Sequence, residues 1–394
     1  MEEEAPIIYG LDFQARSLCA QYGETEMVRF LIGTQSLKSE NSIHCVEYDE
    51  ESVLVSKFVY PHPLGEIWQT NAHPNQADVV GTVHKGSNQK MSATIYKMSP
   101  VPNIGQSIDS LDSTSHGQLE VLASLERGDN QEVAKLLWQP NDGNKVVTVN
   151  TDSRINVWDF SSEGRVQNEV HSEPLVKTHN QVTAANWSPH HGTNQIAVAM
   201  ETNLQIIDLR SINKGSIYNI ENAHNEPIRD LDFNPNRQLL HGHLRRRRMY
   251  QILGRSQYQQ SPSSTVTITT IGKVWQVRYN VFHDQLVLTA GSDARVVLTS
   301  AASLSSEPFG KLMSDDKDND EDDDVRSPLA DGVITAYEEH EDSVYSVAWS
   351  SADSWTFASL SYGGRLLIHR VPTLVKTQHP FLNVAPNFMF SPVD

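Results

Sequence analysis

The sequence predicts an all-β protein in which one small antiparallel sheet is repeated along the chain. Three observations support this prediction. Short apolar stretches rich in β-branched residues recur, polar turn residues separate them, and related units return at intervals of about 40 residues. The clearest unit is the last one, in which His340–Trp349 is followed by the apolar stretch Thr356–Ile368. One such unit cannot cover both of its own faces, so neighbouring units must pack against each other.

The units align on a valine or isoleucine that begins one strand. A few positions later an aromatic residue meets a turn, as in Trp187-Ser-Pro189 and Phe233-Asn-Pro235. One unit ends in Trp158-Asp159, the dipeptide that is typical of a WD-repeat blade. Four short strands per unit with this ending predict a seven-bladed WD-repeat β-propeller, which is a ring of sheets with only short, protected edges.

Each blade is expected where the repeat pattern returns. The starting strand Ile7–Phe13 is expected to pair beside the last blade and so close the ring. Residues 99–117 are rich in Ser, Pro and Asp, and residues 311–330 contain the acidic run 315–324, so both are expected to be flexible insertions. The acidic run lacks the glycine and the ligand spacing of a calcium loop. The seven expected blades lie near residues 7–48, 65–98, 118–160, 178–210, 223–260, 271–300 and 333–371.

Residues 242–272 do not fit the repeat. Four consecutive arginines, Arg245–Arg248, stand where the fifth blade should end in a Trp-Asp strand. A basic stretch of this kind can indicate nucleic-acid binding or nuclear import. However, Gly242–Arg255, written in allowed codons and read one nucleotide later, gives Ala-Thr-Cys-Gly-Asp-Asp-Gly-Cys-Thr-Lys-Phe-Trp-Asp, which is the missing blade ending. We therefore expect a frame-shifted segment at 242–272. Sequencing of the transcript tests this, because a single continuous frame that encodes the arginines would refute it.

The composition favours a binding protein over an enzyme. The chain has 394 residues and a net charge of −18, which disfavours general binding to nucleic acid or to anionic lipid. Its two cysteines, Cys19 and Cys45, offer neither a disulfide framework nor zinc spacing, which indicates a reducing compartment. No apolar run approaches the length of a membrane span, and the acidic N-terminus lacks a signal-peptide core. Without a glycine-rich phosphate loop or a nucleophile elbow, we expect no catalytic residues, no metal and no cofactor.

The candidate binding residues follow the first valine or isoleucine of each unit. In a propeller this position starts the innermost strand, near one rim and beside the central opening. Tryptophan, tyrosine and arginine dominate the energetics of protein interfaces, and four of the six positions carry them. We therefore predict that Trp68, Arg229, Trp275 and Tyr345 bind a partner; the alternative is that the aromatic residues only cover the core between blades. The six positions are Trp68, Ala134, Thr183, Arg229, Trp275 and Tyr345.

Two histidines precede innermost strands, and we expect structural roles for them. His224 and His340 are predicted to join buried hydrogen-bond networks with aspartate and serine or threonine, rather than to act in catalysis or metal binding. His62, which lies between two prolines, is expected in a loop.

Several longer stretches go beyond generic propeller patterning. They are Ala5–Arg16, Gly33–Lys38, Gly65–Trp68, Trp187–His191, Glu221–Asn236, Ser305–Gly310, Tyr337–Tyr345, Leu360–Arg365 and His369–Pro372. Together these stretches resemble the family of EARP and GARP complex-interacting proteins, and the resemblance covers nearly the whole chain except 99–130 and 242–272. It implies a non-enzymatic adaptor that binds the EARP and GARP vesicle-tethering complexes and supports endosomal recycling, endosome-to-Golgi retrograde transport and dense-core vesicle maturation. It also implies a cytoplasmic protein, peripheral at the trans-Golgi network and endosomes.

A propeller fold alone leaves other interaction modules open. The alternatives are a substrate receptor of a ubiquitin ligase and a cargo receptor for organelle import. Asp208-Leu-Arg210 partly matches a ligase-docking signal, with Ile207 in place of the tryptophan. Identification of the proteins that co-purify with this chain distinguishes these alternatives from a trafficking adaptor.

Overall fold

The computed structural model describes most of the chain. Residues 101–114 and the acidic run 315–324 lie outside the described residues, so the structure does not bear on the flexibility expected there. Much of 242–272, where a frame-shifted segment is expected, also lies outside them. The described residues are 5–37, 40–86, 89–100, 115–126, 131–161, 166–171, 174–175, 181–224, 227–237, 242–244, 249–254, 264–269, 273–306 and 331–378.

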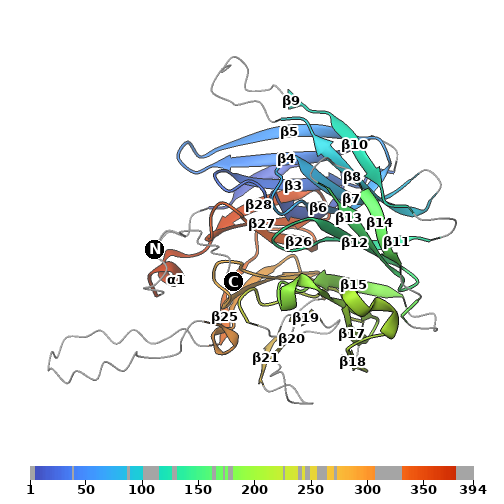
Figure 1. Ribbon diagram of the computed structural model, residues 1–394. Coiled ribbons are helices and arrows are strands. Elements are labelled where there is room, and N and C mark those ends of the chain that lie inside the picture. Colours follow the sequence, from blue (N-terminus) through green and yellow to red (C-terminus); the bar gives the residue numbers. More distant parts are fainter. Residues whose placement is uncertain are drawn as a thin grey trace, which may run out of the picture.

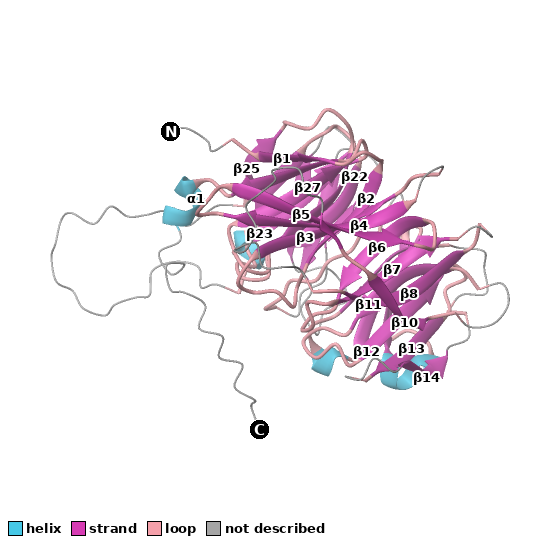
Figure 2. Cartoon of the chain, turned by 90° about the horizontal axis from the view of Figure 1, so that it is seen from above, coloured by secondary structure: helices cyan, strands magenta, loops and turns pink. Residues whose placement is uncertain are grey.

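The chain folds into antiparallel sheets that pack side by side as the blades of a propeller (Figures 1 and 2). Blades 1 to 3 come from the N-terminal half. Blade 1 also carries the short strand β9 (Ser115–His116), which runs parallel to β5. The strands of these blades are β2 (Ala15–Ala20), β3 (Val28–Thr34), β4 (Asn41–Asp49) and β5 (Leu54–His62); β6 (Glu66–Ala72), β7 (Val79–Lys85), β8 (Met91–Met98) and β10 (Leu119–Ser124); and β11 (Val133–Trp138), β12 (Lys145–Asn150), β13 (Ile155–Phe160) and β14 (Val166–His171).

Blades 4 to 6 follow, together with short helices at the blade ends. Within the described residues, the 3-10 helices are η2 (His191–Thr193), η3 (Leu209–Lys214) and η4 (Ala302–Leu304), and the α-helix is α1 (Thr373–Gln378). The strands are β15 (Val182–Trp187), β16 (Gln195–Met200), β17 (Asn203–Asp208) and β18 (Tyr218–Ile220); β22 (Val274–Tyr279), β23 (Leu286–Gly291), β24 (Val296–Ser300) and β25 (Gly332–Tyr337); and β26 (Val344–Trp349), β27 (Thr356–Ser361), β28 (Arg365–Arg370) and β1 (Ile7–Gly10).

The two ends of the chain share blade 6. Strand β1 pairs antiparallel with β28, and Ile7 lies opposite Ile368 while Gly10 lies opposite Arg365. Figure 1 shows the red C-terminal strands directly beside the blue N-terminal ones. The predicted closing role of the first strand is therefore confirmed, and the ring is fastened by backbone hydrogen bonds between the two ends.

The predicted number of seven blades is wrong, because the structure has six. Where the fifth of the expected seven blades (223–260) was placed, residues 227–234 run as an extended segment between blades 4 and 5 without forming a ladder strand. Ile228 and Leu231 on this segment are buried, as an innermost strand requires. Its sequence continues past Pro235 into Arg245–Arg248 rather than into an apolar second strand, so no four-stranded sheet forms on it. The strands β19 (Gly242–Leu244), β20 (Met249–Gly254) and β21 (Ser264–Thr269) make a separate three-stranded sheet.

The boundary between blades 2 and 3 also differs from the expected one. Strand β10 (Leu119–Ser124), which falls within the third expected unit, pairs with β8 and is the outer strand of blade 2. Its residues are only half-buried or exposed. Outer strands have one face toward solvent and therefore a weak apolar pattern. Because of this weak pattern, the blade to which an outer strand belongs is hard to predict from the sequence.

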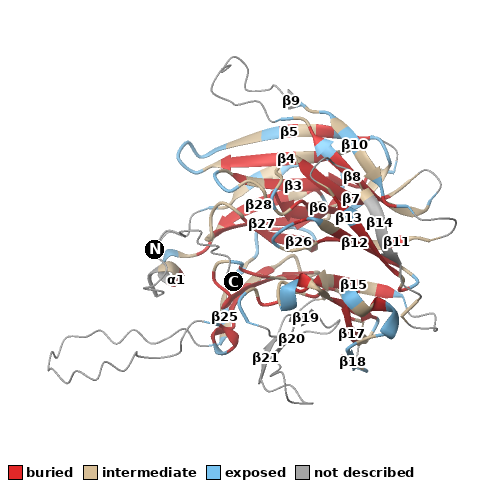
Figure 3. Cartoon of the chain, in the orientation of Figure 1, coloured by how far each residue is buried: buried red, intermediate tan, exposed pale blue. Residues whose placement is uncertain are grey.

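The core lies between neighbouring blades. Middle strands such as β7 and β27 are buried on both faces, because each is covered by a blade on either side (Figure 3). Both cysteines belong to this core and are unpaired thiols. Burial raises the pKa of Cys19 to about 11 and that of Cys45 to about 12, so both thiols are protonated at neutral pH.

Candidate interaction surface at one rim of the propeller

Every innermost strand has a β-bulge at its second residue. In β6, for example, Ile67 pairs with His84 and Gln69 pairs with Val83, so Trp68 is the extra residue between them. Such a residue leaves the ladder and its side chain is re-aimed. The six bulge residues therefore project at equivalent places around one rim of the ring. They are Arg16, Trp68, Ala134, Thr183, Trp275 and Tyr345.

The structure places three of the four predicted binding residues at these bulges. Trp68, Trp275 and Tyr345 stand there, and Arg229 comes from the equivalent place on the extended segment 227–234. Trp68 is 40% exposed, which is high for a tryptophan, while the other three are half-buried. The column of the sequence alignment therefore corresponds to a real structural position. Whether it binds a partner is a separate question.

These side chains form one continuous stack. The rings of Trp275 and Tyr345 lie 4.8 Å apart and nearly parallel, at an interplanar angle of 19°. The guanidinium of Arg229 lies 5.6 Å from the Trp275 ring centroid. At the other end, the Arg16 guanidinium lies 4.6 Å from the Tyr345 centroid and 5.3 Å from that of Trp68. Cation–π attraction and offset stacking both favour this order.

Two members of the stack were missed by sequence reasoning. Arg16 joins Trp68 to Tyr345, and Tyr362 lies 4.9 Å from the Arg16 guanidinium and 5.6 Å from the Tyr345 ring. Arg16 follows Ala15, whereas the other bulge residues follow valine or isoleucine, so the first unit did not align on this column. We call the six residues Arg16, Trp68, Arg229, Trp275, Tyr345 and Tyr362 the rim array.

The rim array covers only one part of the ring. On blades 3 and 4 the bulge positions carry Ala134 and Thr183, which offer little contact area. The Thr183 hydroxyl donates to the carbonyl of Ala199 on its own blade. The rim is therefore asymmetric, with large aromatic and cationic groups on one side and small ones on the other.

The residues after the bulges on blades 2 and 5 link innermost strands of neighbouring blades. The Gln69 side chain donates to the Leu136 carbonyl (2.9 Å) and accepts from the Leu136 amide (3.0 Å), which joins blade 2 to blade 3. The Gln276 side chain accepts from the Val347 amide (2.6 Å) and so joins blade 5 to blade 6. Buried side chains here replace the backbone ladder that separate sheets cannot share. This network fixes the bulges, and with them the rim array.

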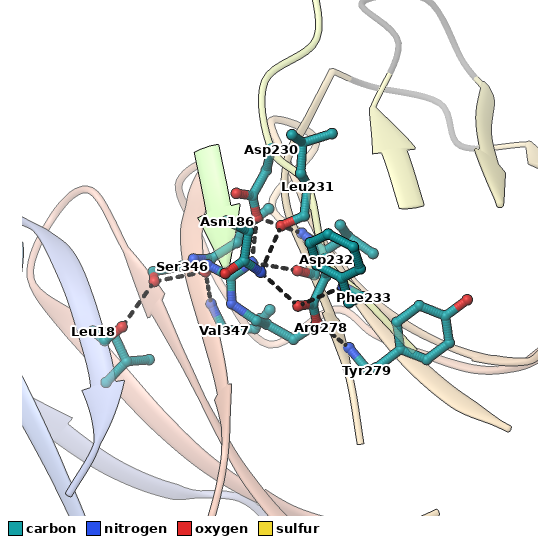
Figure 4. A network of polar contacts seen from close by, with 12 residues as sticks. Leu18, Asn186, Asp230, Leu231, Asp232, Phe233, Arg278, Tyr279, Ser346 and Val347 are labelled. Carbon is teal, nitrogen blue, oxygen red and sulfur yellow. Dashed lines mark hydrogen bonds and ion pairs between the residues drawn. The ribbon is translucent and has the colours of Figure 1, made fainter. Parts of the chain in front are cut away.

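Residues 227–234 are tied in by charged side chains (Figure 4). Asp230 accepts from the Val277 amide (3.1 Å), and its Oδ2 lies 2.5 Å from Nη1 of Arg278. Asp232 accepts from the Tyr279 amide (2.7 Å) and from the Asn186 side chain (2.9 Å). The segment is therefore bound to blade 4 on one side and blade 5 on the other. This holds Arg229 within the rim array although its own strand has no ladder.

Burial shifts the protonation equilibria of this charged cluster. Burial raises the pKa of Asp232 to about 6, although the Arg278 charge opposes the shift. Burial also acts to lower the pKa of Arg278, but Asp230 and Asp232 more than offset it, so the pKa is raised. These carboxylates accept hydrogen bonds from backbone N–H groups, so their role is structural.

Among the described residues, no three His, Cys, Asp or Glu side chains are placed to hold a metal ion.

Histidines form buried pairs around a shared hydroxyl at two places. In blade 6, Ser359 Oγ lies 2.7 Å from His340 Nε2 and 3.0 Å from His369 Nε2. The buried hydrogen bond predicted between His340 and a hydroxyl is confirmed, with His369 rather than an aspartate as the other partner, and His224 is also buried. Between blades 1 and 2, Thr82 Oγ1 lies 3.3 Å from a ring nitrogen of His62 and 3.3 Å from one of His84. The loop predicted for His62 is therefore wrong, because this residue ends β5 and is buried.

The bulged innermost strands, the four-stranded blades and the shared closing blade define a β-propeller of the WD-repeat class. A family model for the WD domain, G-beta repeat, matches residues 332–369. A second family model, described as the EIPR1 beta-propeller, matches residues 3–299. The chain belongs to this EIPR1 β-propeller family.

Curated relatives agree with this assignment over their full length. The chain is 42% identical to the protein named "EARP and GARP complex-interacting protein 1" from Homo sapiens, over 95% of this chain and 99% of the relative. It is 31% identical to "EARP-interacting protein 1" from Caenorhabditis elegans, over 93% of this chain and 96% of the relative. It is also 29% identical to "WD repeat-containing protein DWA2" from Arabidopsis thaliana, over 92% and 95%. None of the helices among the described residues has the length and apolar character needed to cross a bilayer.

Proposed function

We propose that this protein is a non-enzymatic adaptor that binds the EARP and GARP vesicle-tethering complexes. The observation that carries the proposal is its full-length similarity to relatives whose names state interaction with these complexes. We further propose that it acts in endosomal recycling, endosome-to-Golgi retrograde transport and dense-core vesicle maturation. In this role it would be a cytoplasmic protein, peripheral at the trans-Golgi network and endosomes.

The rim array is proposed as the surface that contacts the tethering complexes. It presents tryptophan, tyrosine and arginine side chains side by side, and these residue types contribute most to interface energetics. The innermost strands that carry the array are cross-linked by Gln69 and Gln276, so the surface is ordered before a partner arrives. Preorganised side chains lose less entropy on binding.

Replacing Trp68 and Tyr345 together by alanine should abolish most of the binding to the tethering complexes. The double change removes the exposed indole and the ring on which both Arg16 and Trp275 stack. Interface anchors of this kind contribute about 2 kcal/mol or more each, so we expect at least a tenfold loss of captured tether subunits. Affinity capture of the tagged protein from cells, with subunits quantified by mass spectrometry, measures this.

The matched control is Thr183→Ala, which changes a bulge residue on the opposite side of the rim. It should capture wild-type amounts. Thermal unfolding of both variants separates loss of binding from loss of folding. Unchanged capture by a folded Trp68→Ala/Tyr345→Ala variant would exclude the rim array as the contact surface.

Co-purification of ligase scaffolds or import machinery instead of tether subunits would favour the alternative receptor functions. Arg210, the charged end of the ligase-like signal, is paired with Asp208 at 2.6 Å within its own chain.

A further inference from the structure

Among the residues that the structure describes, the two arginines of the rim array have no counter-charge. Other arginines are paired with carboxylates, as Arg29 is with Glu47, Arg278 with Asp230 and Arg365 with Glu341. No carboxylate in the described ranges lies within ion-pair distance of Arg16 or Arg229. In a chain of net charge −18, with acidic residues well in excess of basic ones, two guanidinium groups of one side-chain stack that have no carboxylate partner are unusual.

Two N–H donors within the array also lack acceptors. Nε of Arg16 and Nε1 of Trp275 are both buried, and neither has a hydrogen-bond partner among the residues that the structure describes. Trp68, by contrast, donates through Nε1 to Glu66 at 3.2 Å. Buried donors in proteins are nearly always satisfied, so the array is short of acceptors as well as of negative charge. A carboxylate supplies both, because it is an anion that accepts up to about four hydrogen bonds.

We infer that the rim array binds an acidic linear segment of a partner protein, with carboxylate side chains at Arg16 and Arg229 and an apolar side chain against Trp68. This deepens the proposed function, because it specifies the chemistry of the partner segment at the same surface. The two arginines are separated along the stack by Tyr345 and Trp275, which suits a peptide with acidic residues on both sides of an apolar one. The acidic remainder of the chain opposes an anion that approaches elsewhere.

An acidic peptide is a better fit than a nucleic acid. Proteins that bind phosphate backbones use clusters of many Lys and Arg residues, whereas the rim array holds only two arginines within an acidic protein. Trp275, Tyr345 and Tyr362 are half-buried, so Trp68 is the most exposed ring of the array. That arrangement accommodates one apolar side chain, not a series of stacked bases.

The test is selection of a random-peptide phage library on the wild-type protein, followed by binding of the enriched peptides to variants. We expect enriched peptides to carry Asp or Glu on both sides of an apolar residue. Arg16→Gln/Arg229→Gln should weaken their binding at least tenfold, and raised salt should weaken wild-type binding but not the residual binding of the variant. The control Lys57→Gln/Lys214→Gln removes the same charge at exposed positions and should leave affinity within about twofold.

Other outcomes refute the inference. Enriched peptides without acidic residues, an absence of enrichment, or equal binding to both double variants would each overturn it. Arg16→Lys keeps the charge and serves as a folding-neutral second variant; it should retain more binding than Arg16→Gln. The selection does not involve tether subunits, so it is independent of the affinity capture. If tether subunits are captured but no acidic peptides are selected, only this inference is refuted. If acidic peptides are selected but no tether subunits are captured, only the assignment to EARP and GARP is refuted.

Discussion

Replacing Arg278 by methionine should lower the free energy of unfolding by about 3 kcal/mol, the low end of the range for a broken buried ion pair. The change leaves Asp230, whose side chain is 11% exposed, without the guanidinium that lies 2.5 Å from it. It also removes the positive charge that opposes the raised pKa of Asp232. Both carboxylates bind residues 227–234 to blade 5. Without the positive charge of Arg278 beside them, the ring is weakened between blades 4 and 5, where a complete blade is missing.

Arg154→Met is the matched control for this prediction. Arg154 pairs with Asp152 at 3.4 Å, but both side chains are more than 30% exposed, at 32% and 44%. Exposed pairs contribute about 0–1 kcal/mol, so this change should have little effect. Urea unfolding followed by tryptophan fluorescence measures both variants. Equal stability of the two would show that the Arg278 cluster does not hold the segment.

Acidification should destabilise the protein by several kcal/mol between about pH 6.5 and pH 5. Burial lowers the pKa of His62 and His369 to about 3, and that of His84 and His340 to about 4. The unfolded chain has histidines of pKa about 6.5, so below that pH the unfolded state takes up protons that the folded state excludes. The stabilisation is complete above the unfolded pKa and is lost as the pH falls, by about 1–2 kcal/mol for each histidine at pH 5.

Asp232 acts in the opposite direction. Its raised pKa of about 6 means that the folded state binds this proton more readily, so this one group favours folding as the pH falls toward about 4. One carboxylate does not offset four histidines. Urea unfolding across this pH range checks the net effect, and stability that stays constant or rises on acidification would contradict it. His369→Phe should reduce the proton uptake on unfolding by about one.

The sequence was sufficient for the propeller class and for most of the rim, because both follow from a repeated local pattern. Every blade begins with a strand whose first apolar residue is buried, and Val274 and Val344 mark that start clearly. Ala15 marks it weakly, which is why Arg16 was missed. The strand Ile7–Gly10 was placed correctly because its apolar residues had no other blade to join.

The blade count could not be obtained in the same way. Ile228 to Phe233 carry the full pattern of an innermost strand, and their burial confirms that part. Whether a blade follows depends on the next three strands, and the residues after Pro235 do not continue the pattern. The stacking of Trp275 on Tyr345 likewise depends on the spacing of adjacent blades, which no single unit encodes.

The pairing of β1 with β28 also determines when the propeller ring can close during translation. About 360 residues separate Ile7 from Ile368, so a ribosome that adds about 5–20 residues per second needs roughly 20–70 s between the two partners. Throughout that interval the N-terminal strand β1 of the nascent chain lacks its pairing strand, and blade 1 lacks blade 6, which packs against one of its faces. Chaperone engagement during translation is therefore expected to concentrate on these first residues and to end only when the last strands emerge.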